Sequence, residues 1–411
     1  MMESSRKLSK PLARIRWKPI YVALISLSLP LTPLVTQASL FNGLGDLPGG
    51  NFGSAAYSLS ADGSVVVGNG ISASGTEAFR WASGSGMVGL GDLAGGFFHS
   101  EAYGVSGDGS VVVGIGRPVS GVEAVRWTSA GGLVGLGDLA GGSAFSLAQG
   151  VSADGSVVVG SGTSAGGREA FRWTSGSGMV GLGDLTGGAV HSEAYGTSTD
   201  GLVVVGYGAG LSGQEAFRWT SGDGMVGLGD LPGGNFTSIA LGVSGNGSAV
   251  IGYADSANGT EAFRWTTESG MIGLGDLVGG SFDSAARGAS FNGEIVVGRA
   301  TVGTADPAWH QSKAFIWDSV NGMRDLQTVL ETEHGLGTRL EGWTLFEALA
   351  VSADGSTIVG SGLNPAGIPE AWRAQLTPVP LPAAFPLFAA GLGLISLMFK
   401  RRRSEGEKDG D

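Results

Sequence analysis

One period constrains this chain more than any other feature: the segment Gly-Leu-Gly-Asp-Leu recurs every 46 residues. Two further motifs keep the same phase, an Asp-Gly pair first seen at Asp62 and the segment EAFRW at residues 77–81. With degenerate copies included, each motif occurs seven times. A repeat of this length indicates one supersecondary unit per period, packed against its neighbours. The regular copies of the first motif begin at Gly43, Gly89, Gly135, Gly181, Gly227 and Gly273.

Each unit contains four stretches with the pattern of short β-strands. In the first unit we predict them at residues 56–60, 64–68, 77–81 and 87–93. The Asp-Gly pair between the first two is a strong signal for a tight hairpin. No stretch in the repeats keeps a 3.6-residue hydrophobic period. Four antiparallel strands in 46 residues match one blade of a β-propeller.

The order of the motifs predicts how the two ends of the repeat region meet. The chain enters its repeats with a fourth-strand motif and leaves them after EAWRA at 370–374, which no fourth strand follows. We expect residues 42–47 to supply the missing strand, because that pairing removes an exposed sheet edge. The predicted fold class is therefore all-β, a seven-bladed β-propeller whose N-terminal strand closes the last blade. A β-solenoid would leave both ends open and would need capping units.

Other residues have predicted places in this scheme. Gly104 and its copies fall inside the first strand, where small residues let the strands converge on the centre of the ring. Phe79 and Trp81 share one face of the third strand and are expected to fill the gap between blades. The last unit carries an extra segment at 326–341, which predicts a short helix or an ordered loop before the sheet resumes at 343–345.

Composition and charge exclude several kinds of site and partner. The 411 residues include 77 glycines and no cysteine, which excludes disulfide frameworks, thiolate metal sites and cysteine nucleophiles. Eleven of the 24 basic and five of the 36 acidic residues lie in the two ends, which leaves the body a net charge near −18. Nucleic acid and anionic lipid headgroups need basic surfaces, so we expect neither as a partner of the body.

Both ends carry the patterns of an exported protein. Residues 1–38 contain six basic residues, an apolar run and then a small–x–small pattern, which is the order of a secretory signal peptide. Residues 383–399 form an uncharged apolar stretch just long enough to span a bilayer. Four basic residues follow at 400–403, and the positive-inside rule then leaves the tail at 404–411 in the cytoplasm and the body outside.

The repeated motifs GLGDLPGG, SADGSVVVG and EAFRW resemble the HAF-type extracellular repeats of bacteria, over roughly residues 43–376. The C-terminus is similar to a PEP-CTERM sorting signal of the VPLPA type, whose motif residues here are Val379, Pro380, Leu381, Pro382 and Ala383. That resemblance implies a Gram-negative bacterium, cleavage near the motif by an exosortase, and export linked to extracellular polysaccharide. It also implies a precursor held transiently in the inner membrane through 383–399.

These signals divide the chain into a signal peptide at 1–38, a propeller at 39–376, a sorting segment with its transmembrane helix at 377–403 and a tail at 404–411. The expected location is the cell surface or the extracellular space.

The repeated polar residues have structural explanations. Asp46 and its copies are expected to accept backbone hydrogen bonds at a strand end, since calcium β-rolls need nine-residue repeats. Asp62 and its copies shape turns, where asparagine also serves. Glu77 and Arg80, with their copies, are expected to form a ring of ion pairs between blades; a charged recognition ring is the alternative.

No motif indicates catalysis. The four histidines have no metal-ligand spacing, and a GxSxG match at 162–166 lies in a Gly/Ser loop rather than at a strand-to-helix elbow. We therefore expect no catalytic residue, no metal and no cofactor in a surface or matrix protein that binds polysaccharide or protein partners. The alternative is a secreted propeller hydrolase or lyase acting on polysaccharide, and a glycosidase would need two carboxylates in one nonrepeated pocket.

The candidate ligand-binding surface is formed by loops. Loops from strand four to strand one, and from strand two to strand three, are expected on the same face of the ring. They vary between repeats while the strands hardly change, and recognition usually resides in variable loops on a rigid scaffold. Sugar rings would stack on their aromatic residues, unless these only cap the core between blades. The candidate residues are Phe52, Phe98, His99, Phe145, His191, Phe236 and Phe282.

The two end signals make a prediction about the exported protein. Its mature form should start near Ser39 and lack the apolar segment at 383–399, because signal peptidase and the exosortase remove the ends. Intact-mass measurement of the exported protein checks both positions. An intact C-terminus in the extracellular fraction would contradict the sorting signal.

Overall fold

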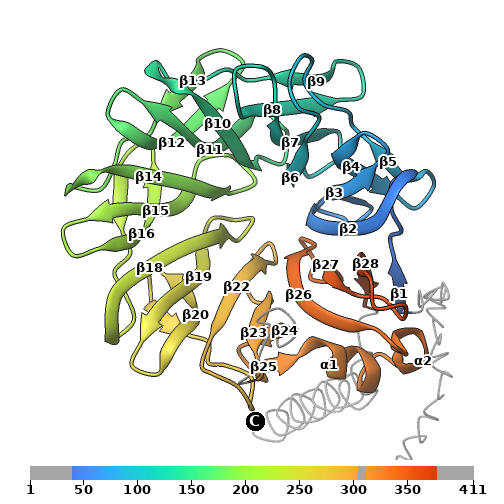
Figure 1. The fold of residues 1–411 in the computed structure, drawn as a ribbon. Helices are drawn as coiled ribbons and strands as arrows, with labels where there is room; N and C mark the ends of the chain where they lie inside the picture. The colour runs from blue at the N-terminus through green and yellow to red at the C-terminus, as the bar shows by residue number, and fades with distance from the viewer. Residues whose placement is uncertain (1–38, 304–311, 377–411) are drawn as a thin grey trace, which may run out of the picture. The chain divides into compact units, whose positions relative to one another are not determined.

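A computed structural model describes residues 39–303 and 312–376 of the chain. These residues form four-stranded antiparallel units that stand around a common centre (Figure 1). The prediction of an all-β fold is confirmed, and the arrangement of the units is that of a β-propeller. The predicted signal peptide at 1–38, the sorting segment at 377–403 and the tail at 404–411 lie outside the described residues.

In the units that follow the N-terminal strand, four consecutive strands pair in chain order. The first three units are β2 (Gly49–Leu59), β3 (Val65–Ser72), β4 (Gly75–Ala82), β5 (Gly86–Gly89); β6 (Glu101–Val105), β7 (Val111–Gly116), β8 (Glu123–Thr128), β9 (Gly132–Gly135); and β10 (Gly141–Val151), β11 (Val157–Ser164), β12 (Gly167–Thr174), β13 (Gly178–Gly181). The next three are β14 (Gly187–Thr197), β15 (Val204–Gly210), β16 (Gln214–Thr220), β17 (Gly224–Gly227); β18 (Gly233–Val243), β19 (Ala249–Ser256), β20 (Gly259–Thr266), β21 (Gly270–Gly273); and β22 (Ser284–Ala289), β23 (Val296–Thr301), β24 (Ser312–Asp318), β25 (Gly322–Asp325). A single parallel bridge between Arg168 and His191 joins the third and fourth units into one sheet.

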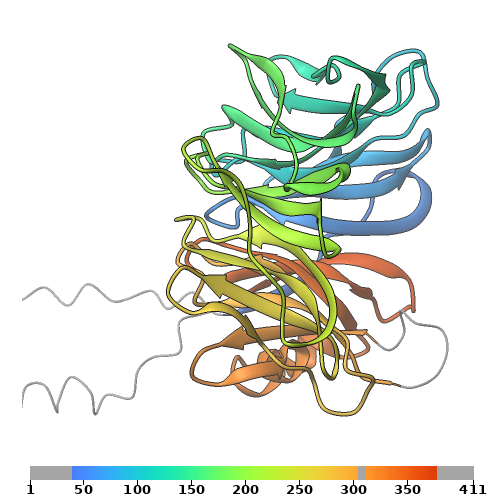
Figure 2. The ribbon, with the colours of Figure 1, turned by 90° about the vertical axis from the view of Figure 1, so that its left-hand side faces the viewer.

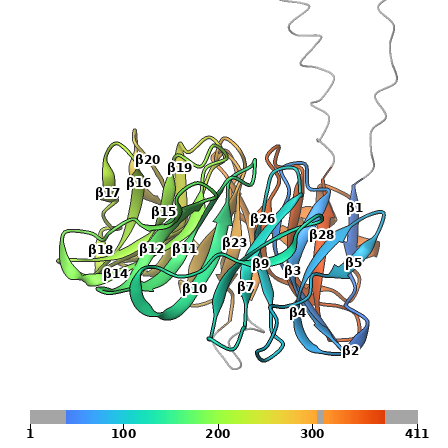
Figure 3. The same cartoon turned by 90° about the horizontal axis from the view of Figure 1, so that it is seen from above.

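The last unit is built from both ends of the described chain. It contains β26 (Thr344–Val351), β27 (Thr357–Leu363) and β28 (Pro369–Gln375), and β1 (Leu40–Gly43) pairs antiparallel with β28. Leu40 lies opposite Gln375, so the chain enters and leaves the sheet at the same point. Figure 3 shows β1 beside β28, and Figure 2 shows the orange and red units opposite the green ones across the ring.

The strand bounds differ from the prediction at two places. The first strand of four units begins at the paired glycines, as in β2, because Gly49 pairs with Ser72 and extends the hairpin. The fourth strand ends early, as β5 does at Gly89, because Gly91 has a positive φ of 77° that an extended strand does not allow. The closing strand is shifted for the same reason, and β1 covers Leu40–Gly43 instead of residues 42–47.

The extra segment of the last unit is helical, as predicted. It forms α1 (Leu326–Thr332) and a short α2 (Gly337–Leu340), and the sheet resumes at Thr344. Asp325 caps α1 by accepting a hydrogen bond from the Thr328 amide at 3.2 Å. Asp325 is the aspartate of the last, degenerate copy of the GLGDL motif, and here it is the N-cap of a helix.

Buried serines join each unit to the one before it, except the last unit, where Phe346 holds the serine position. The hydroxyl of Ser192 accepts a hydrogen bond from the Ala170 amide at 3.0 Å and donates to the Gly183 carbonyl at 2.6 Å. Ser54 does the same for the last unit, where it accepts from the Ala371 amide at 3.1 Å. A lost hydroxyl would leave a buried amide unsatisfied, at a cost of about 1–3 kcal/mol. The same pair of bonds is made by Ser100, Ser146, Ser238 and Ser284.

A chain of backbone hydrogen bonds connects the tight turns between the first and second strands. Ala61 donates to the Gly107 carbonyl of the next unit at 3.0 Å, and the pattern continues from unit to unit. The last of these residues, Ala353, donates to the Ala61 carbonyl at 2.9 Å. We call this set the turn ring: Ala61, Gly107, Ala153, Thr199, Gly245 with Asn246, Phe291 and Ala353.

Aromatic residues fill the space between units, as predicted. Phe79 is fully buried and Trp81 is 9% exposed. Both belong to a cluster with Val359 and Ala371 of the last unit. The inner strands also converge as expected, since a Cβ on Gly104 would lie 3.0 Å from the Gln149 carbonyl oxygen.

The predicted ring of ion pairs between Glu77 and Arg80 is wrong. Residues three apart in a strand point to opposite faces. Accordingly, Glu77 accepts a hydrogen bond from the Gly91 amide within its own unit at 2.9 Å. Arg80 reaches the other way and donates to the Gly109 carbonyl of the next unit at 3.0 Å. Each side chain therefore forms a hydrogen bond with the backbone, Glu77 within its own unit and Arg80 with the next unit.

The repeated aspartates have the predicted structural roles. Asp46 accepts a hydrogen bond from the Gly53 amide at 3.0 Å, across the turn into the first strand. Asp62 accepts from the Ser60 hydroxyl at 2.6 Å and from the Ser64 amide at 2.9 Å, within the tight turn. Asn246 makes the same two bonds with its side-chain oxygen in a later unit.

The pairing of β1 with β28 makes a prediction about stability. Deletion of residues 40–47 should lower the melting temperature far more than its length suggests, because it exposes an edge of β28 and removes Leu44 and Leu47 from a buried cluster. Thermal unfolding of the deletion variant checks this. Deletion of an equal number of residues from the tail at 404–411 is the control, and equal melting temperatures of the two variants would contradict the prediction.

Candidate functional site

The innermost strand of every unit contributes one residue at the same repeat position to the central channel. Two cavities lie along this channel, with volumes of about 570 Å³ and about 290 Å³. The residues at the shared position line both cavities and therefore lie where the two meet. We call them the channel ring: Tyr57, Tyr103, Gln149, Tyr195, Leu241, Arg287 and Leu349.

A β-bulge accompanies each residue of the channel ring. In the first unit the register of β2 on β3 shifts between Ala56 and Ser58, and Tyr57 has no paired residue on β3. The register shifts at the same repeat position in every other unit. A bulge re-aims a side chain, whereas the neighbouring Ala56 is fully buried. The backbone therefore has the same bulged geometry in each unit, while the side chain at that position differs between units.

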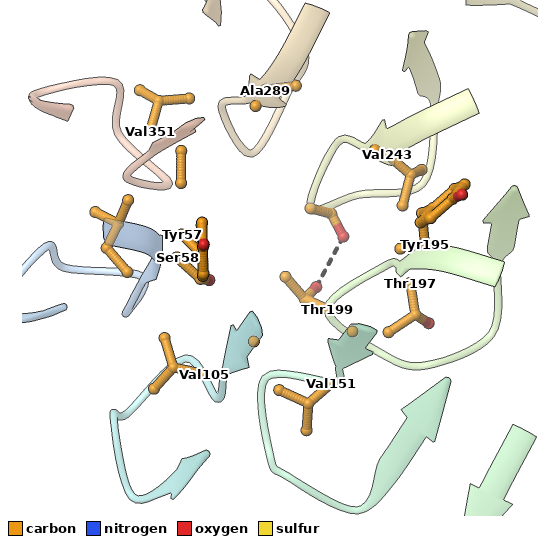
Figure 4. A pocket seen from close by; sticks show the side chains of 18 of the residues that line it. Tyr57, Ser58, Val105, Val151, Tyr195, Thr197, Thr199, Val243, Ala289 and Val351 are labelled. Carbon is orange, nitrogen blue, oxygen red and sulfur yellow. Dashed lines mark hydrogen bonds between the residues drawn. The ribbon is translucent and has the colours of Figure 1, made fainter. Parts of the chain in front are cut away.

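The two ends of the channel differ in chemistry. The smaller cavity lies at the turn ring, and Figure 4 shows Val105, Val151, Val243 and other short side chains around it. The Thr199 hydroxyl donates to the Gly245 carbonyl there at 2.9 Å. The larger cavity lies at the opposite end, which we call the loop mouth. Its lining beyond the channel ring includes Tyr253, Thr260, Asp283 and Arg299.

The loop mouth gathers the tyrosines of the described chain. Four of the five line its cavity, and the fifth, Tyr207, stacks on Tyr195 with ring centroids 6.0 Å apart. Tyr57 and Tyr103 also contact each other, with centroids 5.6 Å apart. Burial, with the field of the Glu101 carboxylate, raises the pKa of Tyr57 to about 12. These phenols therefore stay neutral and offer both ring faces and hydroxyl groups to a ligand.

Several charged groups at the loop mouth are paired, and two, Arg287 and Glu347, have no ion pair to a described residue. Glu101 contacts His99 at 2.9 Å and Glu193 contacts Arg168 at 3.1 Å. Asp283 and Arg299 lie 3.7 Å apart. Arg287 of the channel ring has no hydrogen bond or ion pair to a described residue, and its Nε is buried.

The ligand residues predicted from sequence occupy two adjacent repeat positions. Phe52, Phe98, Phe236 and Phe282 hold the first, and His99, Phe145 and His191 hold the second. The pairing of Gly49 with Ser72 brings the two predicted loops together. However, Phe52, Phe145, His191 and Phe236 lie within long first strands and not within loops.

The two positions differ in their surroundings. At the first, Phe52 is 44% and Phe236 37% exposed. At the second, the side chains contact groups of the loop mouth: the His191 ring contacts the Tyr207 hydroxyl at 3.1 Å. The guanidinium of Arg168 lies 4.3 Å from the ring centroid of Phe145. None of the seven predicted residues lines the cavity itself. The second position lies nearer to it, because His191 contacts Tyr207, whose ring stacks on the cavity-lining Tyr195.

The channel ring itself was not predicted, although a signal for it exists in the sequence. Its position varies through Tyr, Gln, Leu and Arg while the flanking alanine and glycine hardly change. A variable position inside a constant strand indicates a side chain that leaves the repeated core. The bulge that turns it toward the channel has no separate sequence signature.

Neither metal sites nor membrane spans occur in the part of the chain that the structure describes. Among residues 39–303 and 312–376 no three His, Asp or Glu side chains are grouped to hold a metal ion. Within the same residues no helix is long and apolar enough to cross a membrane. The span predicted at 383–399 lies outside them.

No family model matches the chain, and no curated protein matches its sequence. Several solved structures are similar in architecture. TolB from Acinetobacter baumannii aligns at 12% identity over 79% of this chain and 63% of its own, with a TM-score of 0.41, so the chain spans less than two thirds of that protein. An oligogalacturonate lyase from Vibrio parahaemolyticus aligns at 9% identity over 82% and 97% of the two chains, with a TM-score of 0.49. The Dos1 propeller aligns at 8% over 82% and 95%, with a TM-score of 0.44.

The buried tyrosines predict the behaviour of the exported protein in alkali. Their pKa values are raised in the folded state, to about 12 for Tyr57 and Tyr207, against about 10 in an unfolded chain. Their contribution to stability is present below pH 10 and is lost as the pH rises towards 12, because ionisation favours the unfolded state. Ultraviolet titration of tyrosinate should therefore show ionisation together with unfolding. The same titration in denaturant is the control, and native ionisation near pH 10 would contradict the burial of these rings.

Proposed function

We propose that this protein is an exported, non-catalytic β-propeller of the cell surface or extracellular matrix that binds polysaccharide at the loop mouth. The observation that carries the proposal is the cavity of about 570 Å³ lined by four tyrosines and a few polar groups. Aromatic faces with nearby hydrogen-bonding groups suit the apolar faces and hydroxyls of sugar rings. A protein partner that inserts a polar segment into the loop mouth is the alternative ligand at the same site.

The proposed scaffold is a closed ring of seven blades. Three kinds of contact between the last unit and the first support closure. They are the bond from Ala371 to Ser54, the bond from Ala353 to Ala61, and the bond from Arg373 to the Gly63 carbonyl at 3.0 Å. Each repeats a contact made between consecutive units elsewhere. A ring joined in this way holds the loop mouth in a fixed shape, which lowers the entropic cost of binding.

The carboxylates at the loop mouth favour binding over hydrolysis. Asp283 is the one carboxylate among the cavity-lining residues, and it is close to Arg299. Glu101 and Glu193, outside that lining, hold His99 and Arg168. A glycosidase needs a second, suitably separated carboxyl group as acid or nucleophile. We therefore propose a binding role, and a hydrolase or lyase is the alternative that product analysis tests.

Export and processing complete the proposal. The sequence patterns at 1–38 and 377–403 and their resemblance to a signal peptide and a PEP-CTERM signal support secretion and cleavage by an exosortase. The acidic body, which lacks the basic surface that nucleic acid needs, is consistent with an extracellular setting.

The test is retention of the exported protein on exopolysaccharide purified from the same cells. Replacing Tyr103 by alanine should reduce affinity about fivefold, since an aromatic contact contributes on the order of 1 kcal/mol. Phe52→Ala and Phe236→Ala, at exposed positions away from the cavity, are the matched controls. Retention lost in the phenylalanine variants and kept in Tyr103→Ala would move the site to the outer loops. Release of shortened sugars during incubation would favour the enzyme.

A further inference from the structure

Arg287 is the one cation of the channel ring. It lies in β22 at the repeat position that holds Tyr57, Tyr103 and Tyr195 in other units. Its guanidinium lines both cavities and thus faces the channel at its narrow zone. Nothing in the repeat requires a charge at this position, because leucine occupies it in both adjacent units, at Leu241 and Leu349.

The guanidinium has no partner in the described residues. Its Nε is buried without a hydrogen-bond acceptor, as are those of Arg126 and Arg218, and no ion pair joins Arg287 to a described carboxylate. The contrast with Arg264 is direct, since that arginine donates to the Gly293 carbonyl at 2.9 Å. Arg287 as a whole is half-buried, and its terminal nitrogens are not among the buried atoms without a partner. A half-buried cation on a cavity wall, at a position where both adjacent units hold leucine, is placed to take a partner supplied from outside.

The charges around Arg287 define what that partner can be. Arg299 lines the same cavity and repels the Arg287 charge, while the Glu347 carboxylate attracts it from beyond contact distance. Asp283 sits on the far side of Arg299, 3.7 Å from it. Burial lowers the pKa of Arg287, yet an arginine with an ordinary pKa above 12 stays charged at neutral pH. The loop mouth thus presents a cation with free donors beside a second, half-satisfied one.

We propose that Arg287 binds the carboxylate of an acidic sugar, a hexuronate residue, whose ring stacks on the tyrosines of the loop mouth. This inference rests on the proposed function and specifies its ligand. A guanidinium offers two parallel N–H donors, the geometry that a carboxylate accepts. Arg299 supplies the second cationic contact, and Tyr57 and Tyr103 supply ring faces on the other side of the cavity.

The surroundings favour one carboxylate over a phosphate. A phosphate monoester carries about −1.5 to −2 charges at neutral pH and needs several cationic donors. Here Asp283 pairs with Arg299 and leaves Arg287 as the cation without an ion pair, which suits one negative charge better than two.

The acidity of the body is compatible with an acidic ligand. Its net charge near −18 repels polyanions at long range, but salt screens that repulsion beyond about 8 Å at physiological ionic strength. The contact at Arg287 is desolvated and much less screened. Binding of the acidic sugar should therefore change little, or strengthen, as salt is raised from low to physiological concentration.

Calorimetric titration of the exported protein tests the inference. The probes are trisaccharides of glucuronate, mannuronate and galacturonate, and the methyl ester of each, which keeps the shape and removes the charge. At least one acid should bind at least tenfold more tightly than its ester. Arg287→Gln should abolish that preference, and Arg287→Lys should retain part of it because it keeps the charge without the planar fork. Arg117→Gln, at an exposed arginine outside the cavity lining, is the matched control and should bind as wild type does.

The outcomes separate this inference from the proposed function. Equal binding of acids and esters, with Arg287→Gln unchanged, overturns the carboxylate contact and leaves polysaccharide binding in place. Competition by inorganic phosphate at equal concentration overturns the choice of a carboxylate. Failure of every trisaccharide and of the purified exopolysaccharide overturns both. Arg287→Gln should melt no lower than wild type, because the Arg287 side chain bonds no described residue. A large loss of stability would make Arg287 a structural residue and overturn the inference.

Discussion

A buried serine hydroxyl between consecutive units is the interaction on which the rest of this fold depends. It bonds the third strand of one unit and the turn that leads into the next, as Ser192 does with Ala170 and Gly183. A unit on its own would leave that amide without a partner and an aromatic face without cover. The units are therefore stable as neighbours, and the contacts between them fix the radius at which their inner strands meet.

That fixed radius explains why the channel position can vary from unit to unit. The strands cannot change without disturbing two interfaces, because alanine and valine on both faces are fully buried. The bulged residue belongs to neither interface and points into the space the ring leaves open. Tyr195 and Leu241 hold this position in consecutive units, so the lining of the channel differs between them while the packing of the strands is the same. Side chains that could bind a ligand can therefore differ at this position without a change in the packing between units.

Much of the frame could be predicted from sequence, and the candidate site could not. The Asp-Gly turns, the buried Phe79 and the helical insertion follow from local patterns that depend on nearby residues alone. The predicted ring of ion pairs between blades is wrong because Glu77 and Arg80 both bond backbone groups instead, and the sequence does not show that those groups lie within reach. The channel ring depends on register shifts and on contacts between residues 46 apart, and neither has a local pattern.

The meeting of Leu40 with Gln375 has a mechanical consequence. Because β1 and β28 are antiparallel and the chain leaves both at the same end of the pair, tension between the two ends peels the strands apart one hydrogen bond at a time. Strands pulled from opposite ends would instead share the load across all their bonds. A pull between the ends would separate β1 from β28 at a low force, while the serine-linked units elsewhere stayed intact. A load applied to the C-terminal end and resisted at the loop mouth would pass through β28 and bypass β1.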